Sequence, residues 1–255
     1  MALKLKNNFQ ESLLINKTIF FPKQGILAIG DLHLGYETML REQGISLPFN
    51  QIKTTKKQIE EIIKEINSNK YRLKKIILLG DIKHYFKFQK SEYFEIRKFK
   101  KFLEKFVPKK NIILIRGNHD KAVSKKEDYR DFYISEDKKI AFLHGHKSFP
   151  EIKDNKKIKT LVMSHIHPAI NIKDPNGIKM EKYKAFLIGK YNSKRYIVVP
   201  SFFPLIEGSE INEFYSASNN FVFSIVPYKK LMDFQTFIVG KDRIYGFGKL
   251  KDIQK

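Results

Sequence analysis

Five short apolar segments of this chain run directly into His, Asp or Asn, and this pattern constrains the fold most strongly. GILAI at 25–29 and KIILLG at 75–80 have the length and composition of buried strands. ILIRGNHD at 113–120 shows the pattern in full, because an Asn, a His and an Asp follow the apolar run directly. A turn would account for the Gly and Asn but does not require the His and Asp. We therefore interpret these positions as candidates for chemistry.

The order of the apolar segments predicts an α/β fold with at least one large sheet. Residues 51–69 place Ile at helical spacing between Lys and Glu, which indicates an amphipathic helix. Ser91 with Glu92 is suited to cap a second helix, whose apolar face carries Phe99, Phe102, Leu103 and Phe106. Further strands are predicted at 111–117, 139–145, 160–167, 195–201 and 221–226, with a hairpin turning near Gly240 within 236–248. The polar stretches 121–138 and 147–159 are predicted to be surface loops, and no linker divides the single domain predicted for residues 1–255.

The histidines have one position in common. Each lies at or just beyond the carboxyl end of a predicted strand, where open α/β folds build their sites. A lone His on a strand is more often structural, but here no His is left over for that role. The seven are His33, His84, His119, His144, His146, His165 and His167, accompanied by Asp31, Asp81, Asn118 and Asp120. The clustering of such ligand types predicts a metal site.

Composition narrows the chemistry and the partners. The chain has no Cys, so a metal must be held by His, Asp, Glu or Asn, which suits Mn²⁺, Fe²⁺ or Zn²⁺. The net charge of +22 is typical of a protein with a polyanionic partner, but only seven of the 49 basic residues are Arg. Nucleic-acid binding and a Lys-rich genome composition remain alternative explanations of this charge. Without an apolar run of about 18 residues or a signal-peptide core, a cytoplasmic protein with no membrane contact is expected.

Five motifs in order carry a resemblance to a known family. DLH (31–33), GD (80–81), GNHD (117–120), HGH (144–146) and SHIH (164–167) resemble the calcineurin-like metallophosphoesterase superfamily. The wider stretches DLHLGYE, GDIKH and VVPSFFPLIEG resemble the archaeal SbcD-related phosphoesterases more closely. The resemblance implies a four-layer αββα sandwich with two mixed sheets. The chain departs from the pattern at Ser164, where the family usually has Gly, and at Phe203, where Asn is common.

The resemblance also implies a ligand set for two divalent ions, expected to be Mn²⁺ with Fe²⁺ or Zn²⁺ as alternatives. One ion would be held by Asp31, His33 and His167, and the other by Asn118, His144 and His165. A carboxylate between them, Asp81, would bridge the two ions. Such a centre activates a water molecule as the nucleophile of phosphoester hydrolysis.

The resemblance places His119 at the scissile phosphate, where it would protonate the leaving oxygen, and Asp120 would orient its imidazole. His144 and His146 lie two residues apart on an extended segment, so both face the same way, and His144 is the preferred ligand. His84, Arg116 and His146 are expected to contact substrate, although each has an alternative structural role.

Three functions are compatible with these motifs. A nuclease or phosphodiesterase acting on DNA or RNA agrees with the SbcD-like stretches and the basic charge. A phosphatase or phosphodiesterase for small molecules or phosphoproteins would use the same core. A non-catalytic scaffold, as in the retromer subunit that shares the fold, would be expected to have lost ligands. A homodimer and a separate ATPase or repair partner are additional hypotheses.

Overall fold

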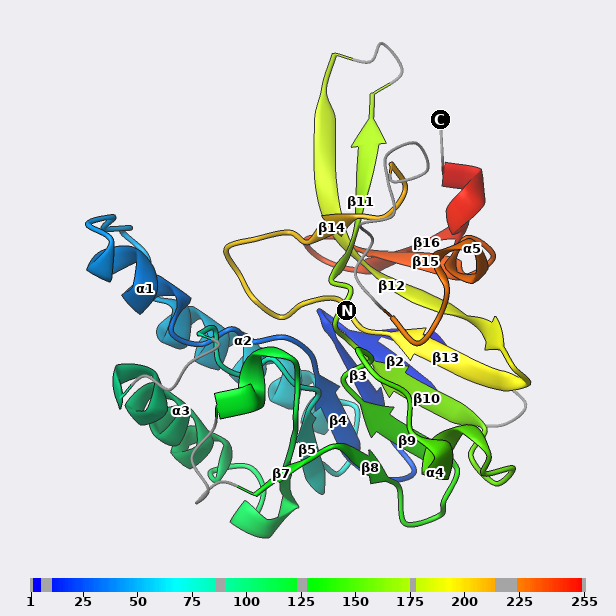
Figure 1. The fold of residues 1–255 in the computed structure, drawn as a ribbon, viewed down its shortest axis with the longest axis horizontal. Helices are drawn as coiled ribbons and strands as arrows, with labels where there is room; N and C mark the ends of the chain where they lie inside the picture. The colour runs from blue at the N-terminus through cyan, green and yellow to red at the C-terminus, as the bar shows by residue number, and fades with distance from the viewer. Residues whose placement is uncertain are drawn as a thin grey trace.

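Two β-sheets packed face to face form the centre of the molecule (Figure 1). The computed structural model describes residues 2–5, 11–85, 90–122, 128–174, 178–213 and 224–253. The first sheet follows chain order, with the strands β1 (Leu3–Leu5), β2 (Ser12–Ile15), β3 (Thr18–Phe21), β4 (Ile26–Ile29), β5 (Lys75–Leu78), β6 (Ile112–Ile115) and β7 (Tyr129–Arg130). Strands β4 to β7 run parallel, whereas the strands before them are antiparallel.

The second sheet is also mixed. Its spatial order is β14 (Ser209–Glu210), β11 (Pro168–Lys173), β12 (Met180–Tyr191), β13 (Lys194–Val198), β10 (Thr160–Met163), β9 (Ile140–Leu143) and β8 (Phe132–Ile134). Strand β15 (Gln235–Val239) pairs with β12, and β16 (Ile244–Lys249) pairs with β15. The central strands β9, β10 and β13 are parallel, so their carboxyl ends meet at one edge.

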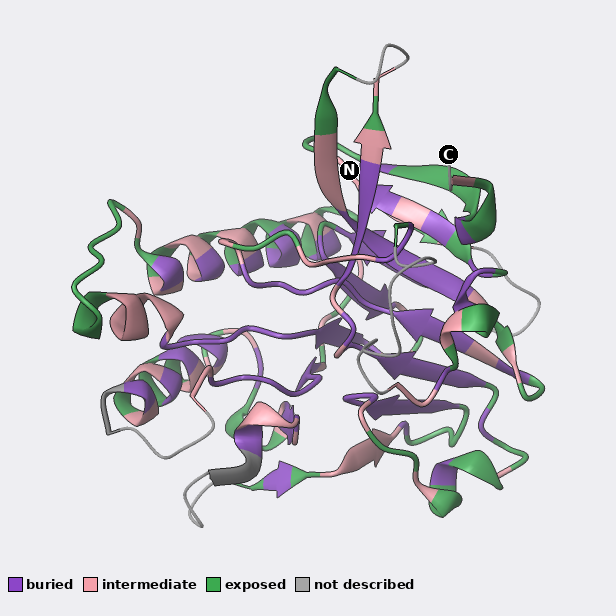
Figure 2. Ribbon diagram, turned by 45° about the horizontal axis from the view of Figure 1, so that its top comes forward, coloured by how far each residue is buried: buried purple, intermediate pink, exposed green. Residues whose placement is uncertain are grey.

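Helices cover the outer faces of both sheets, giving four layers (Figures 1 and 2). Along β5, Ile76 and Leu78 pack under α2 (Gln51–Ser68) and α3 (Lys90–Leu103), whereas Ile77 faces the second sheet. A strand buried on both faces needs apolar residues at every position, which explains the continuous apolar runs. The remaining helical segments are α1 (Tyr36–Glu42), α4 (Pro150–Lys153), α5 (Tyr228–Leu231) and the 3₁₀ turns Lys109–Asn111, His119–Ala122 and Leu250–Ile253. The predicted α/β four-layer sandwich is confirmed.

Most predicted elements are present, with some differences. The hairpin predicted at 236–248 is formed by β15 and β16. The capping role predicted for Ser91 was wrong, because α3 already begins at Lys90. The loops predicted at 121–138 and 147–159 contain β7, β8 and α4. The strand predicted at 221–226 lies outside the described residues at 221–223, and residues 224–226 are not in a strand. Strands β1–β3, β11 and β12 were not predicted.

The described residues include no helix that combines the length and the apolar composition needed to cross a bilayer.

Two buried lysines hold a segment that borders the polar edge of the sheets. Lys17, in the turn between β2 and β3, donates to the Phe202 carbonyl oxygen at 3.1 Å and to the Gln58 side chain at 2.8 Å. Lys184 on β12 donates to the carbonyl oxygens of Ser201, at 3.0 Å, and of Phe203. Backbone carbonyls that would otherwise be buried without donors are satisfied in this way.

Replacing Lys17 by Met should remove a pH dependence of stability. Burial lowers the pKa of Lys17 from 10.5 to about 7. Between these values the unfolded chain binds a proton that the folded chain does not, so folding stability rises with pH. The free energy of unfolding of wild type, relative to Lys17→Met, should therefore rise by up to about 1.4 kcal/mol per pH unit across this range. Urea titrations at several pH values would measure this, with the exposed Lys64→Met as the matched control. Parallel curves for wild type and Lys17→Met would contradict it.

Candidate metal centre

The polar residues predicted from the five strands meet at one edge of the two-sheet sandwich. Strands β4, β5 and β6 of the first sheet and β9 and β10 of the second all end there. A bridge between Gly30 and Ser201 joins the two sheets at this edge. The Ser201 hydroxyl donates to the Asp31 carbonyl oxygen at 3.1 Å, which fixes the backbone where the first candidate ligand begins.

The backbone at this edge adopts a conformation that side chains other than Gly seldom take. Non-Gly residues with positive φ cost of order 1–3 kcal/mol each and gather at functional sites. Five candidate ligands have such values: Asp31 (44°), His33 (45°), Asp81 (46°), His165 (76°) and His167 (46°). Such values at five of the candidate ligands are therefore typical of a functional site.

Two glycines of the motifs allow the strands' ends to pack closely. A Cβ on Gly117 would lie 2.1 Å from Asp81 Oδ1 and 2.3 Å from its backbone nitrogen. A Cβ on Gly80, where φ is 98°, would lie 2.6 Å from Nδ1 of His144. These contacts explain why Gly precedes Asp81 and Asn118, since any side chain there would displace a candidate ligand.

Asp81 is the common member of the candidate ligand groups. Among the described residues, three trios have ligand atoms that all lie within 4.8 Å of one another. They are His33, Asp81 and His119; Asp81, His144 and His165; and Asp31, Asp81 and His167. The sharing of one carboxylate by all three is what a bridging ligand requires.

One half of the cluster is arranged around His144, which is buried. Its Nδ1 lies 2.8 Å from the Leu79 carbonyl oxygen, so this nitrogen carries a hydrogen and Nε2 faces the other candidate ligands. Nε2 lies 3.0 Å from Asn118 Oδ1, 3.1 Å from His165 Nδ1 and 3.5 Å from Asp81 Oδ2. His146 belongs to none of the three trios, and its ring centre is 5.3 Å from that of His144. The geometry therefore favours His144 as the ligand.

The other half is arranged around Asp31, which is fully buried. Its Oδ2 lies 3.4 Å from Nε2 of His167, and both carboxylate oxygens accept from the backbone N–H of His165 at 3.3–3.4 Å. The ring of His33 packs edge-on against that of His167, with 5.2 Å between centres.

The charges in the cluster suit bound cations. Burial alone would raise the pKa of Asp81, but its hydrogen bond to His144 and the charge of that ring lower it below the usual range. Burial lowers the pKa of His33 to about 3, helped by repulsion from His167, so its ring is neutral. Burial opposes a proton on His144, yet Asp81 and Asp31 raise its pKa to about 9. Anionic carboxylates, a neutral imidazole and a field that favours positive charge at His144 fit a divalent metal ion.

Unsatisfied buried atoms support the same conclusion. Among the described residues, the buried His33 Nδ1 has no hydrogen-bond partner, and the buried His167 Nε2 has no well-formed hydrogen bond besides its 3.4 Å approach to Asp31 Oδ2. A buried nitrogen without a partner is costly unless another group occupies its lone pair. The donor set of imidazoles, carboxylates and one carboxamide therefore fits Mn²⁺, Fe²⁺ or Zn²⁺ at this position.

His119 lies beside the cluster, and its orienting partner differs from the prediction. Its Nδ1 is 2.7 Å from the His84 carbonyl oxygen, and its Nε2 is 3.9 Å from Asp81 Oδ2. The predicted role of Asp120 in orienting this ring is not what the structure shows. The Asp120 carboxylate is buried and accepts from the backbone N–H of Gly117 at 2.9 Å and of Lys83 at 3.3 Å. Asp120 thus joins the ends of β5 and β6, and the His84 carbonyl holds the imidazole.

The residues expected to contact substrate lie at the same edge but differ in setting. The ring of His84 stacks at 30° on that of His119, with 5.9 Å between centres. Burial lowers the pKa values of both His84 and His146 to about 4, so both are neutral near pH 7. Arg116 is partly exposed, and its guanidinium lies 3.8 Å from the Asp131 carboxylate.

The supporting roles of two residues were not predicted from the sequence. The buried Glu92 accepts the backbone N–H groups of His84, at 2.6 Å, and Tyr85. Burial raises the pKa of Glu92 to about 7. Tyr36 packs edge-on against His84 and Phe203, with ring centres 4.8 and 5.0 Å away. Tyr36 stands in the stretch DLHLGYE, and Glu92 stands near the start of α3. Only the tertiary contacts show that both residues support His84.

The departure at Ser164 is accommodated without disturbing the cluster. Its buried hydroxyl lies 3.1 Å from the Leu79 carbonyl oxygen and 3.3 Å from His144 Nδ1. The positive φ falls on the following residue, His165, so the turn does not require Gly at 164.

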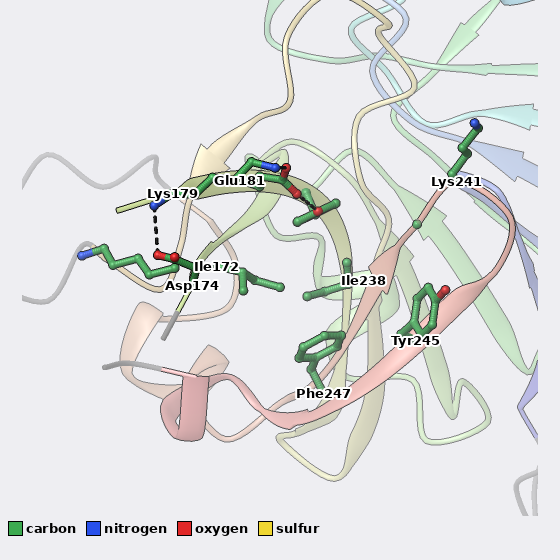
Figure 3. Close-up of a pocket in the computed structure, with 11 residues that line it drawn as sticks. Ile172, Asp174, Lys179, Glu181, Ile238, Lys241, Tyr245 and Phe247 are labelled. Atoms are coloured by element: carbon green, nitrogen blue, oxygen red, sulfur yellow. Dashed lines mark hydrogen bonds and ion pairs between the residues drawn. The ribbon is translucent and has the colours of Figure 1, made fainter. Parts of the chain in front are cut away.

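A sizeable cavity lies elsewhere. It measures about 620 Å³ and is lined by residues of the β11–β12 and β15–β16 hairpins, including Ile172, Ile238 and Phe247 (Figure 3). None of the candidate ligands lines it, so the chemistry at the sheet edge does not depend on this cavity.

The fold and the cluster of candidate ligands are those of a metallohydrolase. Comparison with known proteins gives the family. The family model for calcineurin-like phosphoesterases matches residues 25–219, so the chain belongs to that family. It is thus a metal-dependent phosphoesterase by family, with candidate ligands for two ions.

Solved structures share the fold. A nuclease MPE from Pseudomonas putida is similar over 97% of this chain and 100% of its own, with a TM-score of 0.62 and 16% identity. Two structures of Vps29 from Entamoeba histolytica, a single mutant and the wild type with Zn²⁺, have TM-scores of 0.39 and 0.37, with 11% and 13% identity. In both cases the similarity covers 87% of this chain and 96% of the Vps29 chain. No curated protein matches the sequence significantly.

Proposed function

We propose that this protein hydrolyses phosphodiester bonds of nucleic acid at a centre of two divalent ions, with Mn²⁺ as the expected metal. The observation that carries the proposal is the position of Asp81, which belongs to all three ligand trios, one of which includes His119. The preference for nucleic acid rests on the stretches that resemble archaeal SbcD-related phosphoesterases. The similarly folded Pseudomonas putida protein is a nuclease, which agrees with this preference.

The ligands divide into two groups around Asp81. Asp31, His33 and His167 would hold one ion, and Asn118, His144 and His165 the other. Bound there, the ions would neutralise the phosphate and lower the pKa of a water molecule that acts as nucleophile. Asp31 and Asp81 supply the only carboxylates of this set, so the loaded site keeps a net positive charge that attracts a phosphodiester.

His119 has the geometry of the proton donor. A carbonyl oxygen can only accept, so the His84 contact places the hydrogen on Nδ1 and leaves Nε2 to exchange a proton at the cluster. Glu92 fixes the backbone at His84 and thereby the position of that carbonyl. His119 would then protonate the leaving oxygen as the P–O bond breaks.

A comparison of substrates tests the proposal. With added Mn²⁺, we expect turnover of bis-p-nitrophenyl phosphate and cleavage of labelled single- or double-stranded DNA or of RNA, all abolished by a chelator. Turnover of p-nitrophenyl phosphate with intact nucleic acid would instead favour a phosphatase for small molecules or phosphoproteins. Absence of turnover with Mn²⁺, Fe²⁺ and Zn²⁺ would overturn the proposal and favour the scaffold function.

A further inference from the structure

Two adjoining hollows on the outside of α3 form a strongly basic surface. The first measures about 740 Å³ and is lined from α2, α3 and the 3₁₀ turn after α3. The only acid that lines it in the described part of the chain, Glu104, lies 3.8 Å from the Lys101 ammonium. Its basic side chains are Lys56, Arg97, Lys98, Lys100, Lys101 and Lys109.

The second hollow continues the first toward the edge of the sheet. It measures about 550 Å³, shares Lys100 and Lys109 with the first, and adds Lys110 and Arg130. Among the described residues its one acid is Asp128, which lies 3.5 Å from the Arg130 guanidinium. This hollow lies between β7, the edge strand of the first sheet, and α3, which lies beside that sheet (Figure 1). We call the two hollows together the α3–β7 groove.

The charge of the α3–β7 groove exceeds what composition explains. Fourteen of the described residues line it and eight of these are Lys or Arg, whereas Lys and Arg make up 49 of the 255 residues of the chain. A third hollow, between α2 and the β15–β16 turn, shows that basic lining is not general. There Lys241 and Arg243 are outnumbered by three acidic residues, Glu61, Glu65 and Asp242.

One end of the groove, at Arg130, approaches the metal centre. Arg130 on β7 is paired with Ile115 at the end of β6, and its carbonyl oxygen accepts the backbone N–H of Arg116 at 2.8 Å. Asn118 and His119 follow two and three residues later. At roughly 3.3 Å per residue, the centre lies no more than about 13 Å of chain beyond the groove.

We propose that the α3–β7 groove binds the phosphate backbone of a nucleic acid whose scissile bond lies at the metal centre. This inference rests on the proposed function and adds the surface that holds the substrate. A small anion would need cations that converge on one point, whereas these side chains are spread over two hollows. A row of phosphates meets such an arrangement and releases counterions as it binds. Most of the cations are Lys, which bind phosphate as point charges, so the contacts position the strand without reading its sequence.

The test removes three charges from the groove. The variant K100Q/K109Q/R130Q would be compared with wild type and with K173Q/K190Q/K241Q, which removes three charges from exposed lysines elsewhere. Binding of labelled single-stranded DNA, the corresponding duplex and RNA of the same sequence would be measured by fluorescence anisotropy in EDTA, so that no cleavage occurs. Titrations at several salt concentrations between about 50 and 200 mM would give the salt dependence.

For the groove variant we expect binding to weaken at least tenfold at low salt. The slope of log K against log salt should fall by about 2–3, since each lost phosphate contact accounts for roughly 0.7–0.9. The control variant should retain most of the affinity and most of the salt dependence of wild type. Equal affinity and slope for the groove and control variants would overturn the inference and leave the charge as a property of composition.

Turnover of bis-p-nitrophenyl phosphate with Mn²⁺ separates this inference from the proposed function. This small diester does not reach the groove, so the groove variant should keep wild-type kcat and KM for it. If wild type hydrolyses no diester, the proposed function fails, while the binding titrations still decide whether the groove holds nucleic acid. If diester turnover is intact and DNA binding ignores the groove, only the groove inference fails.

Discussion

His119→Ala is expected to lower kcat for hydrolysis of a phosphodiester by roughly 10²–10⁴, the usual contribution of a general acid. The imidazole is held by the His84 carbonyl with Nε2 toward Asp81, so Ala removes the proton donor and leaves the ligands named above in place. Steady-state hydrolysis of bis-p-nitrophenyl phosphate would measure the loss. The metal content, measured on the same samples, should remain at the wild-type level.

Metal content decides the role of His119, because geometry admits a second one. His119 forms a trio with His33 and Asp81 whose ligand atoms lie within 4.8 Å of one another. A His119→Ala protein that loses an ion would show that His119 is a ligand and not a proton donor. His146→Ala offers the matched comparison, since His146 lies at the same edge but belongs to none of the trios. We expect His146→Ala to lose less phosphodiester turnover than His119→Ala.

Asp81→Asn is expected to reduce hydrolysis to background and to lower the metal content by at least one ion. Asn has nearly the shape of Asp but lacks the negative charge, and Asp81 is the one carboxylate shared by all three trios. Two cations held close together without a bridging anion repel each other, so at least one ion should be lost. Metal analysis after dialysis and diester turnover in added Mn²⁺ would measure the two effects.

The Asp81→Asn variant should still fold, so a loss of activity and metal can be distinguished from misfolding. Asp81 is buried among His33, His119 and His144, and it accepts the backbone N–H of His119 at 2.9 Å. Asn retains this acceptor, so the metal-free variant should fold, with circular dichroism like that of metal-free wild type. A folded Asp81→Asn protein that retains two ions and wild-type turnover would show that Asp81 is not the bridging ligand.

Local patterns were sufficient for the inner part of the fold. The strands at 25–29, 75–80, 111–117, 139–145 and 160–167 were predicted because a strand buried on both faces requires an unbroken apolar run. The outer strands differ. In β12 (Met180–Tyr191) residues 184–188 are buried, whereas the other residues are partly or fully exposed. The hydrophobic periodicity of this strand is therefore weak. Its pairing with β11, β13 and β15 is made by segments distant in sequence, which local propensity does not encode.

The sequence by itself determined which residues are available for metal chemistry, because strands that end in polar residues deliver them to a common sheet edge. The absence of Cys restricted the ligands to nitrogen and oxygen. Tertiary structure alone decided how these residues are divided. Asp120 follows His119 in the chain but turns to the Gly117 and Lys83 amides, while the His84 carbonyl, 35 residues away, holds the imidazole. Adjacent side chains point in different directions, so partners are set by the packing of two sheets and not by neighbourhood in the sequence.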